Sequence, residues 1–181
     1  MDIGCGPGYL VKLIAKSYSA LNIIGIDVAE AILHTARDNL GLESLDGRVK
    51  FQQGDIQKPP LEENSVDFVV STLSLHHWSD PGQAMLEIQR VLKPGGQFLI
   101  FDLRRDERRF FYWLIYFATN CVMPGALRQI KEPLGSILAS YTPDETSNIL
   151  SQSIFKKWEV KPGFGWLFLW GQKTNDKRKE A

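Results

Sequence analysis

The chain has 181 residues, which is the size of one compact domain and too short for an array of modules. Hydrophobic residues make up 44% of it and charged residues 23%, values typical of a globular protein and not of a disordered or collagen-like chain. Basic and acidic residues balance to a net charge of zero, so no chain-wide positive field favours a nucleic acid or an anionic membrane as a partner.

Strand-like and helix-like segments alternate from the first residue to about Leu103, a pattern typical of a parallel sheet covered by helices on both faces. The predicted strands are residues 22–27, 49–53, 66–72 and 97–103, of which the last two are nearly all apolar, as central buried strands are. The predicted helices are residues 9–17, 29–40 and 81–92, the last with Asp80 as N-cap and ended by a turn at 93–96.

The alternation of strand-like and helix-like segments ends after Leu103. Residues 104–140 show no strand pattern, and we expect a helical, aromatic-rich insert there. Thr142 to Glu145 form a capping box that predicts a helix to about Ser153. Residues 155–160 and 166–172 are predicted to pair as an antiparallel hairpin, and residues 174–181 to be a polar tail. We therefore predict a single domain over residues 1–181.

The cysteine content and the hydropathy pattern suggest where the protein is found. Cys5 and Cys121 are too few for a disulfide framework, and no signal-peptide pattern opens the sequence, so we expect a cytoplasmic protein. The longest apolar run is nine residues, from Phe110 to Ala118, whereas a membrane-spanning helix needs ~20. We expect no transmembrane segment.

A glycine-rich turn lies where the first strand enters the helix 9–17. Gly4, Gly6 and Gly8 suit a tight turn that a ligand approaches without meeting a Cβ atom. The GxGxG spacing differs from the GxGxxG of dinucleotide-binding proteins. Such a turn fits a nucleotide-type cofactor, although a purely structural turn is an alternative.

Acidic residues follow the next two predicted strands. Asp27, beside Val28, is placed to accept hydrogen bonds from both hydroxyls of a ribose, with a helix-capping role as the alternative. Asp55 is placed to accept from an exocyclic amine while Ile56 packs on a base, which would select adenine; an isolated turn acid is the alternative. Glycines and two acids at three successive strand ends favour a cofactor site.

At this point the sequence resembles the class I S-adenosylmethionine-dependent methyltransferases, particularly the small-molecule branch of ubiquinone and menaquinone C-methyltransferases. The matching stretches cover nearly the whole chain and are DIGCGPGYL at 2–10, IIGIDVA at 23–29, GDI at 54–56, VDFVVSTLSLHHWSD at 66–80 and VLKPGGQFLIFDL at 91–103. The resemblance implies a Rossmann-like α/β fold with seven strands in the order 3-2-1-4-5-7-6 and strand 7 antiparallel.

The resemblance also implies roles for individual residues. It implies the three glycines beneath the methionine moiety of S-adenosylmethionine, and Asp2 and the backbone around Leu73 near its amino group. It further implies Asp27 on the ribose and Asp55 on the adenine amine. S-adenosylhomocysteine would be the product.

The segment after the strand 66–72 is where the family places side chains that face the methyl group. His76 or His77 could accept a proton from the acceptor, because imidazole titrates near neutrality; a shaping role is the alternative. Two adjacent histidines do not form a metal site, so we predict no metal. The segment lacks an Asn/Asp-Pro-Pro-Tyr motif, which speaks against methylation of nucleic acid or protein nitrogens.

The aromatic insert suggests the acceptor class. Six of the chain's twenty aromatic residues lie within nine positions, at Phe110, Phe111, Tyr112, Trp113, Tyr116 and Phe117. They could form a lid over an apolar or aromatic acceptor, and the alternative is a helix packed against the sheet or its neighbours. Phe110, Trp113 and Phe117 could also form a homodimer or peripheral membrane contact.

The beginning of the chain departs from the family pattern, because only Met1 precedes Asp2. We expect a shortened first strand, unpaired backbone in its two neighbours, and weaker cofactor binding and lower stability than in a form extended at the N-terminus. Our leading hypothesis is a methyltransferase acting on a small, hydrophobic or aromatic acceptor by in-line displacement. The alternatives are an NAD(P)-dependent oxidoreductase and a cofactor-binding but inactive subunit.

Overall fold

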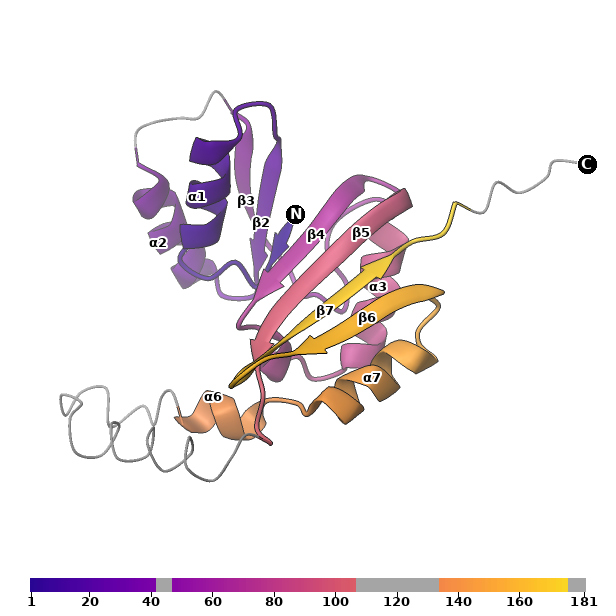
Figure 1. The fold of residues 1–181 in the computed structure, drawn as a ribbon. Coiled ribbons are helices and arrows are strands. Elements are labelled where there is room, and N and C mark those ends of the chain that lie inside the picture. The colour runs from indigo at the N-terminus through magenta and orange to yellow at the C-terminus, as the bar shows by residue number, and fades with distance from the viewer. Residues whose placement is uncertain (42–46, 107–133, 176–181) are drawn as a thin grey trace, which may run out of the picture.

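The computed structural model describes residues 1–41, 47–106 and 134–175 (Figure 1). The strands are β1 Asp2–Ile3, β2 Ile23–Asp27, β3 Val49–Gln53, β4 Val66–Thr72, β5 Leu92–Leu103, β6 Lys157–Pro162 and β7 Trp166–Gln172. The helices are α1 Tyr9–Ser17, α2 Glu30–Leu40, the 3₁₀ helix η1 Leu75–His77, α3 Pro81–Val91, α6 Leu134–Ala139 and α7 Pro143–Gln152.

The seven strands form one sheet in the order β3-β2-β1-β4-β5-β7-β6. The strands β1 to β5 pair in parallel, and β7 pairs antiparallel with both β5 and β6. The predicted strand order and the antiparallel strand 7 are therefore confirmed. The order reverses between β1 and β4, and open α/β sheets bind ligands at such a switch point.

Local sequence signals explain most element boundaries. The Asp80 carboxylate accepts from the Gln83 N–H at 2.9 Å, which caps α3 as predicted. The capping box at the start of α7 is complete, because Thr142 Oγ1 accepts from the Glu145 N–H and the Glu145 side chain accepts from the Thr142 N–H. The hairpin strand β6 begins two residues later than predicted and extends to Pro162.

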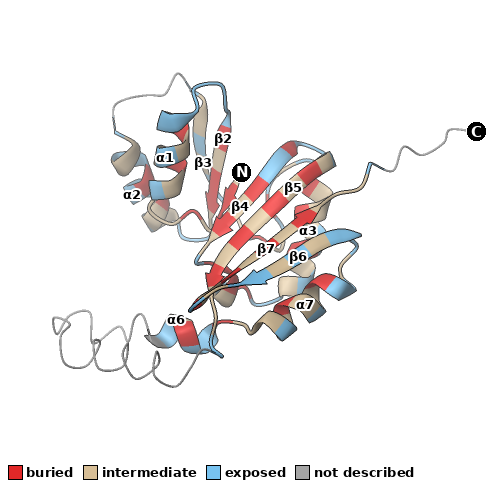
Figure 2. Cartoon of the chain, viewed as in Figure 1, coloured by how far each residue is buried: buried red, intermediate tan, exposed pale blue. Residues whose placement is uncertain are grey.

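Two hydrophobic clusters lie on the opposite faces of the sheet. The larger one joins α3 and α7 to the sheet, with Ile3 and Ile26 among its members. The smaller one joins α1 and α2 to the sheet through Val11, Leu33 and Ile23. In β5 and β7 buried and half-buried residues alternate (Figure 2), so β5 is not buried on both faces as its apolar sequence predicted.

Some predictions fall outside the described residues or need correction. The aromatic run 110–117 lies outside them, as does residue 176 onward of the polar tail. The turn predicted at 93–96 is instead part of β5, which pairs with β4 through an irregular register: Leu92 opposes Val66 and Gln97 opposes Phe68. Gly95, at φ +80, supplies the local distortion of the strand. None of the described helices is both long and apolar enough to cross a membrane.

The shortness of β1, as expected, leaves a groove between its neighbours. Asp2 lies opposite Gly25 of β2 and Val70 of β4, so the first residues of β2 and of β4 extend beyond β1. The Met1 ammonium donates to the Phe68 carbonyl at 2.8 Å at the end of this ladder. The groove measures about 650 Å³ and is lined mainly by apolar side chains.

We expect that four apolar, β-branched residues added before Met1 would fill this groove and pair with both neighbouring strands. Burial of their side chains should raise the midpoint of thermal unfolding by about 5 °C or more, given that 1 kcal/mol shifts it by about 2–4 °C at this chain length. The measurement is calorimetry together with S-adenosylhomocysteine titration, and a Gly-Ser extension of equal length is the control. Equal melting points and equal affinities for the two extended chains would contradict the expectation.

Candidate active site

A cleft lies at the carboxyl ends of β1 to β4, at the point where the strand order reverses. It encloses about 230 Å³ and is open to solvent. Its walls come from the four loops after these strands, and the lining residues are Ile3, Gly4, Asp27, Val28, Gly54, Asp55, Ile56, Gln57, Ser74, His77, Trp78 and Ser79. Segments far apart in the sequence therefore meet at one edge of the sheet.

The glycine turn after β1 forms the floor of this edge. Gly4, Gly6 and Gly8 have φ angles of +68°, +50° and +74°, a region that favours glycine. A Cβ atom on Gly8 would lie 3.0 Å from Ala36 Cβ, so close packing of the loop on α2 also requires glycine there. A Cβ atom on Gly6, in contrast, would have Ile32 Cδ1, at 4.0 Å, as its nearest neighbour beyond residues 5–7. Of the three glycines, Gly4 is the one that lines the cleft.

Asp27 is held by two backbone hydrogen bonds but does not cap α2, whose N-cap is Ala29 and has no side-chain cap hydrogen bond. Its Oδ1 accepts from the Ala29 N–H at 3.1 Å, next to the start of α2, and its Oδ2 accepts from the Gly6 N–H at 2.9 Å. The carboxylate also lines the cleft. Because two carboxylate oxygens offer about four lone-pair sites, two sites stay available to a pair of hydroxyl groups. The structural bonds orient the carboxylate for such a ligand.

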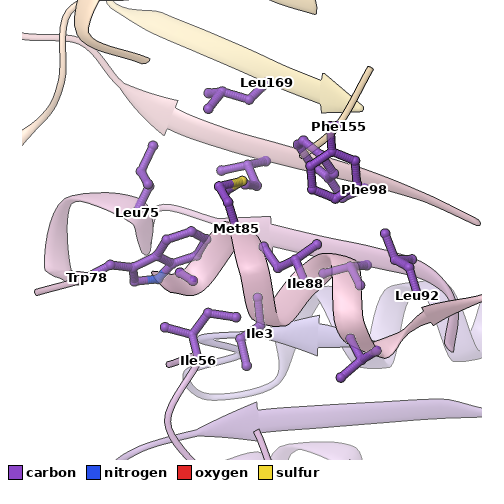
Figure 3. Close-up of a cluster of buried hydrophobic side chains, with 14 of the residues drawn as sticks. Ile3, Ile56, Leu75, Trp78, Met85, Ile88, Leu92, Phe98, Phe155 and Leu169 are labelled. Atoms are coloured by element: carbon purple, nitrogen blue, oxygen red, sulfur yellow. The ribbon is translucent and has the colours of Figure 1, made fainter. Parts of the chain in front are cut away.

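Apolar side chains lie beside the two acids of the cleft. Val28 is 62% exposed and forms part of the wall next to Asp27. Asp55 is exposed and its Oδ1 accepts from the Gln57 N–H at 2.9 Å, which orders the loop after β3. Ile56 and Trp78 line the cleft and belong to the large hydrophobic cluster, where they lie near one another and near Ile3 (Figure 3). The core therefore fixes the position of the cleft walls.

Asp2 is not among the residues that line this cleft. Its side chain is buried, both carboxylate oxygens lack a hydrogen-bond partner among the described residues, and it lines the groove beside the shortened β1. Burial raises the pKa of Asp2 to about 7; the Asp27 charge adds to this and the Met1 ammonium opposes it. Burial likewise raises the pKa of the Cys5 thiol to about 12, as expected of a turn residue and not of a nucleophile.

The segment after β4 carries the remaining predicted residues. Leu73 adopts φ +53°, rare for a residue other than glycine, while its N–H donates to the Phe101 carbonyl at 2.8 Å; it is 49% exposed and does not line the cleft. His77 lines the cleft, whereas His76 turns inward and contacts Asp102. The two predicted histidines therefore lie in different surroundings.

Six residues that line the cleft were not predicted as site residues, namely Ile3, Gly54, Gln57, Ser74, Trp78 and Ser79. Ser74 lies against Gly4 and accepts from the Trp78 indole N–H at 3.0 Å. Gln57 Nε2 donates to Ser79 Oγ and so connects the loop after β3 to the loop after η1. Gln57 directly follows the GDI stretch, and Ser74 and Ser79 lie on either side of the LHHW stretch, which is the one signal that could have indicated these three. Among the described residues, no group of three His, Cys, Asp or Glu side chains is arranged to hold a metal ion.

Comparison with known proteins identifies the family. The family described as "Methyltransferase domain" matches residues 1–100. A structure from Methanococcus maripaludis, described as an S-adenosyl-L-methionine-dependent methyltransferase, superposes with a TM-score of 0.75 and 26% identity, over 98% of this chain and 78% of that one. The chain belongs to the S-adenosylmethionine-dependent methyltransferase family.

Two curated relatives show which kinds of methyltransferase the chain is similar to. Ubiquinone/menaquinone biosynthesis C-methyltransferase UbiE of Geotalea daltonii is 25% identical over 170 residues, which cover 91% of this chain and 69% of that protein. O-methyltransferase cnsE of Penicillium expansum is 33% identical over 160 residues, which cover 88% of this chain and 52% of that protein. The chain spans 28 to 38% of the length of four other curated relatives that it matches. It is thus similar to the ubiquinone/menaquinone C-methyltransferase over most of its own length but to only part of most of these relatives.

The cleft fits the cofactor of this family. Gly4 brings backbone without a side chain to the cleft, and Asp27 has acceptor sites left for hydroxyl groups. Val28 and Ile56 offer apolar surface to a flat base, with the exposed Asp55 carboxylate beside them. These observations agree with a nucleoside bound across the ends of β1, β2 and β3.

Proposed function

We propose that the chain transfers a methyl group from S-adenosylmethionine to a small, apolar or aromatic acceptor. The observation that carries this proposal is the cleft at the switch point, where the glycine turn lies beside the oriented carboxylate of Asp27. A protein with the same fold, phosphoethanolamine N-methyltransferase 2 of Haemonchus contortus, has been solved in complex with S-adenosyl-L-methionine.

Each cleft residue has a distinct part in this proposal. The turn of Gly4, Gly6 and Gly8, of which Gly4 lines the cleft, would lie beneath the methionine arm, Asp27 would accept from the ribose hydroxyls, and Asp55 would accept from the adenine amine. When bound, the cofactor supplies an electrophilic methyl group. The task of the protein is then to hold an acceptor in line with that methyl, at about 3–3.5 Å, and to exclude water. The backbone strain at Leu73 agrees with such a site, because strained residues cluster where ligands bind.

Two of the relatives support a small acceptor. One is a C-methyltransferase of ubiquinone and menaquinone biosynthesis, and the other is an O-methyltransferase. The acceptor, the homodimer or peripheral membrane contact and the cytoplasmic location remain parts of the proposal, the last supported by the low cysteine content.

Isothermal titration with S-adenosylhomocysteine and with NADH tests the proposal. We expect saturable binding of S-adenosylhomocysteine and none of NADH at the same concentrations. Asp27→Asn should weaken S-adenosylhomocysteine binding by about 10- to 100-fold, because a hydrogen bond to a charged group contributes about 1.5–3 kcal/mol. Asp38→Asn, an exposed carboxylate change on α2, is the matched control and should leave the affinity unchanged.

The outcomes separate the three hypotheses. Binding of NADH instead of S-adenosylhomocysteine would support the oxidoreductase. Binding of S-adenosylmethionine without methyl transfer to any of a panel of phenols, enols, amines and thiols would support the inactive subunit. Equal affinity of the wild type and Asp27→Asn would remove the assignment of this carboxylate to the ribose.

A further inference from the structure

The strand β6 forms one outer edge of the sheet (Figure 1). It pairs with β7 on one side, and on its other side it has no strand neighbour among the described residues. An edge strand presents backbone donors and acceptors without partners, which makes it a template for a further strand. The chemistry of this edge therefore decides which strand it can accept.

The pairing with β7 shows which backbone groups of β6 point outward. The Gly163 N–H donates to the Trp166 carbonyl at 2.8 Å, directly after the end of β6. Because alternate residues of an antiparallel ladder direct both backbone groups to the same neighbour, Trp158, Val160 and Pro162 direct theirs away from β7. Proline has no N–H, so the outward donors are those of Trp158 and Val160. No hydrogen bond from the described part of the chain reaches these outward groups.

The side chains of β6 also divide between two faces. Trp158 and Val160 pack against the large hydrophobic cluster, on the face that α7 covers. Lys157, Glu159 and Lys161 lie on the other face, and all three are exposed. Charged and outward-facing residues of the edge are therefore available to a strand that pairs with it.

Two of these charges border an apolar hollow. Glu159 and Lys161 line a space of about 280 Å³ together with the half-buried Leu99, Phe168 and Trp170. Neither charge has an ion-pair partner among the described residues. Interfaces between proteins commonly combine an aromatic centre with charges at the rim. The edge and the adjoining hollow have this composition.

A second copy of β6 complements this edge. If two copies pair antiparallel about a two-fold axis with Val160 opposite Val160, each Val160 N–H meets the carbonyl of the other copy. Each Trp158 N–H then meets a Pro162 carbonyl, and the missing N–H of Pro162 leaves only the Trp158 carbonyl to water. In the same register, Glu159 of each copy lies opposite Lys161 of the other. Such pairs lie between the hydrogen-bonded pairs, where opposing side chains are closest, and opposite charges there are stabilising.

The other registers are disfavoured by the same charges. A shift of two residues in one direction places Glu159 opposite Glu159, and a shift in the other direction places Lys161 opposite Lys161. Like charges directly opposite one another are destabilising. A shift of one residue brings outward groups opposite inward ones and so removes the hydrogen bonds. The sequence of β6 is therefore its own complement in a single register, in which Lys157 lies opposite Gly163 and meets no like charge.

We propose that β6 is a dimerisation edge, at which a second copy of this chain pairs antiparallel with Glu159 of each copy opposite Lys161 of the other. The sheet then continues across both copies, and the two apolar hollows lie on the same face beside the charge pairs. Because the pairing uses the same edge in both copies, it ends at two chains. This interface is distinct from the aromatic run 110–117 and does not depend on the proposed methyl transfer.

The first test measures the dimer dissociation constant by sedimentation equilibrium. Glu159→Lys and Lys161→Glu should each raise Kd by about tenfold or more, because each turns two attractive pairs into repulsive ones. The two changes combined restore opposite charges and should return Kd to within about threefold of the wild type. Lys157→Glu, the same charge change on the same face but opposite Gly163, is the matched control and should leave Kd nearly unchanged. Added salt should weaken the wild-type dimer and strengthen that of either single variant.

The second test reads the register through disulfides, in a Cys121→Ser background in which the buried Cys5 is the remaining native cysteine. Directly opposed residues of the closer kind have Cα atoms about 4.5 Å apart, within the range of about 4.4–6.8 Å that a disulfide spans. A mixture of Glu159→Cys chains with Lys161→Cys chains should therefore form cross-linked dimers on mild oxidation. Neither variant alone should cross-link, and the Cys121→Ser protein alone is the control.

Several results would overturn the proposal. A wild type that stays monomeric at all protein concentrations tested would show that this edge does not join two copies. A dimer whose Kd is unaffected by the single charge changes, or is not restored by the combined change, would have to form through another surface. Cross-linking of Glu159→Cys alone, or of Lys161→Cys alone, would show one of the two shifted registers and exclude the one proposed.

Discussion

Replacing Gly4 with alanine is expected to lower the free energy of unfolding by about 2–5 kcal/mol and to abolish binding of S-adenosylhomocysteine. Two effects add at this position. Gly4 has φ +68°, where an L-residue is strained by about 1–2 kcal/mol. A Cβ atom there would overlap Ser74 Oγ and lie 2.6 Å from Ser74 Cβ, and such overpacking costs about 1–3 kcal/mol. Urea unfolding and calorimetric titration measure the two outcomes.

Gly6→Ala is the matched control, because it carries the backbone strain without the overlap. Gly6 has φ +50°, and the nearest protein atom to an added Cβ is Ile32 Cδ1 at 4.0 Å. We expect a loss of about 1–2 kcal/mol in stability, together with weaker cofactor binding. If Gly6→Ala lowers the free energy of unfolding as much as Gly4→Ala does, the overlap of the added Cβ atom with Ser74 does not contribute to the destabilisation.

Ser74→Gly provides a second control that keeps the test valid if Gly4→Ala fails to fold. It removes both atoms that the added methyl group would meet, although by itself it also removes the acceptor of the Trp78 indole N–H. The double variant should therefore be more stable than the sum of the single changes predicts, by about 1–3 kcal/mol. Strict additivity would contradict a steric role for Gly4.

The parts of the fold that the sequence predicted correctly depend on local signals. Asp80, Thr142 and Glu145 specify helix starts through side chains within three residues of the backbone groups that they cap. The glycine turn and Asp27 were recognised because tight turns and strand ends constrain residue type. The carboxyl ends of parallel strands meet at one edge of the sheet. The alternation of strand and helix patterns in the sequence was therefore enough to predict that these residues lie near one another.

The parts that the sequence did not predict depend on contacts between distant segments. Asp102 lies 26 residues from His76, and no local pattern indicates that its carboxylate meets that ring and not His77. The hydrogen bond from Gln57 to Ser79 joins two loops. The lengths of these loops in the sequence do not show that they come into contact. Asp2 was expected near the cofactor because of its place in the motif; its buried carboxylate lines the groove beside β1, and the next residue, Ile3, lines the cleft.

The stability of the protein should fall as pH rises from about 4 to about 7, because of Asp2. Burial raises the pKa of this carboxyl from 3.8 to about 7 in the folded chain. Between these values the folded state holds a proton that the unfolded state has released, so the free energy of unfolding decreases with pH. A pKa difference of about three units corresponds to about 4 kcal/mol, present in full below pH 4 and lost above pH 7.

Asp2→Asn isolates this contribution. It keeps the size of the side chain but cannot ionise, so it should match the wild type at pH 4 and be more stable by up to about 4 kcal/mol at pH 8. The buried Met1 ammonium, whose pKa is lowered from 8.0 by desolvation, acts in the opposite direction as pH approaches 8. Because that group is present in both chains, the difference between their urea-unfolding curves reports the Asp2 charge together with its attraction to the Met1 ammonium. Glu62→Gln, an exposed carboxyl before β4, is the control. A difference between Asp2→Asn and the wild type that stays constant from pH 4 to pH 8 would show that Asp2 ionises normally, and would imply that a cation or solvent reaches the groove beside β1.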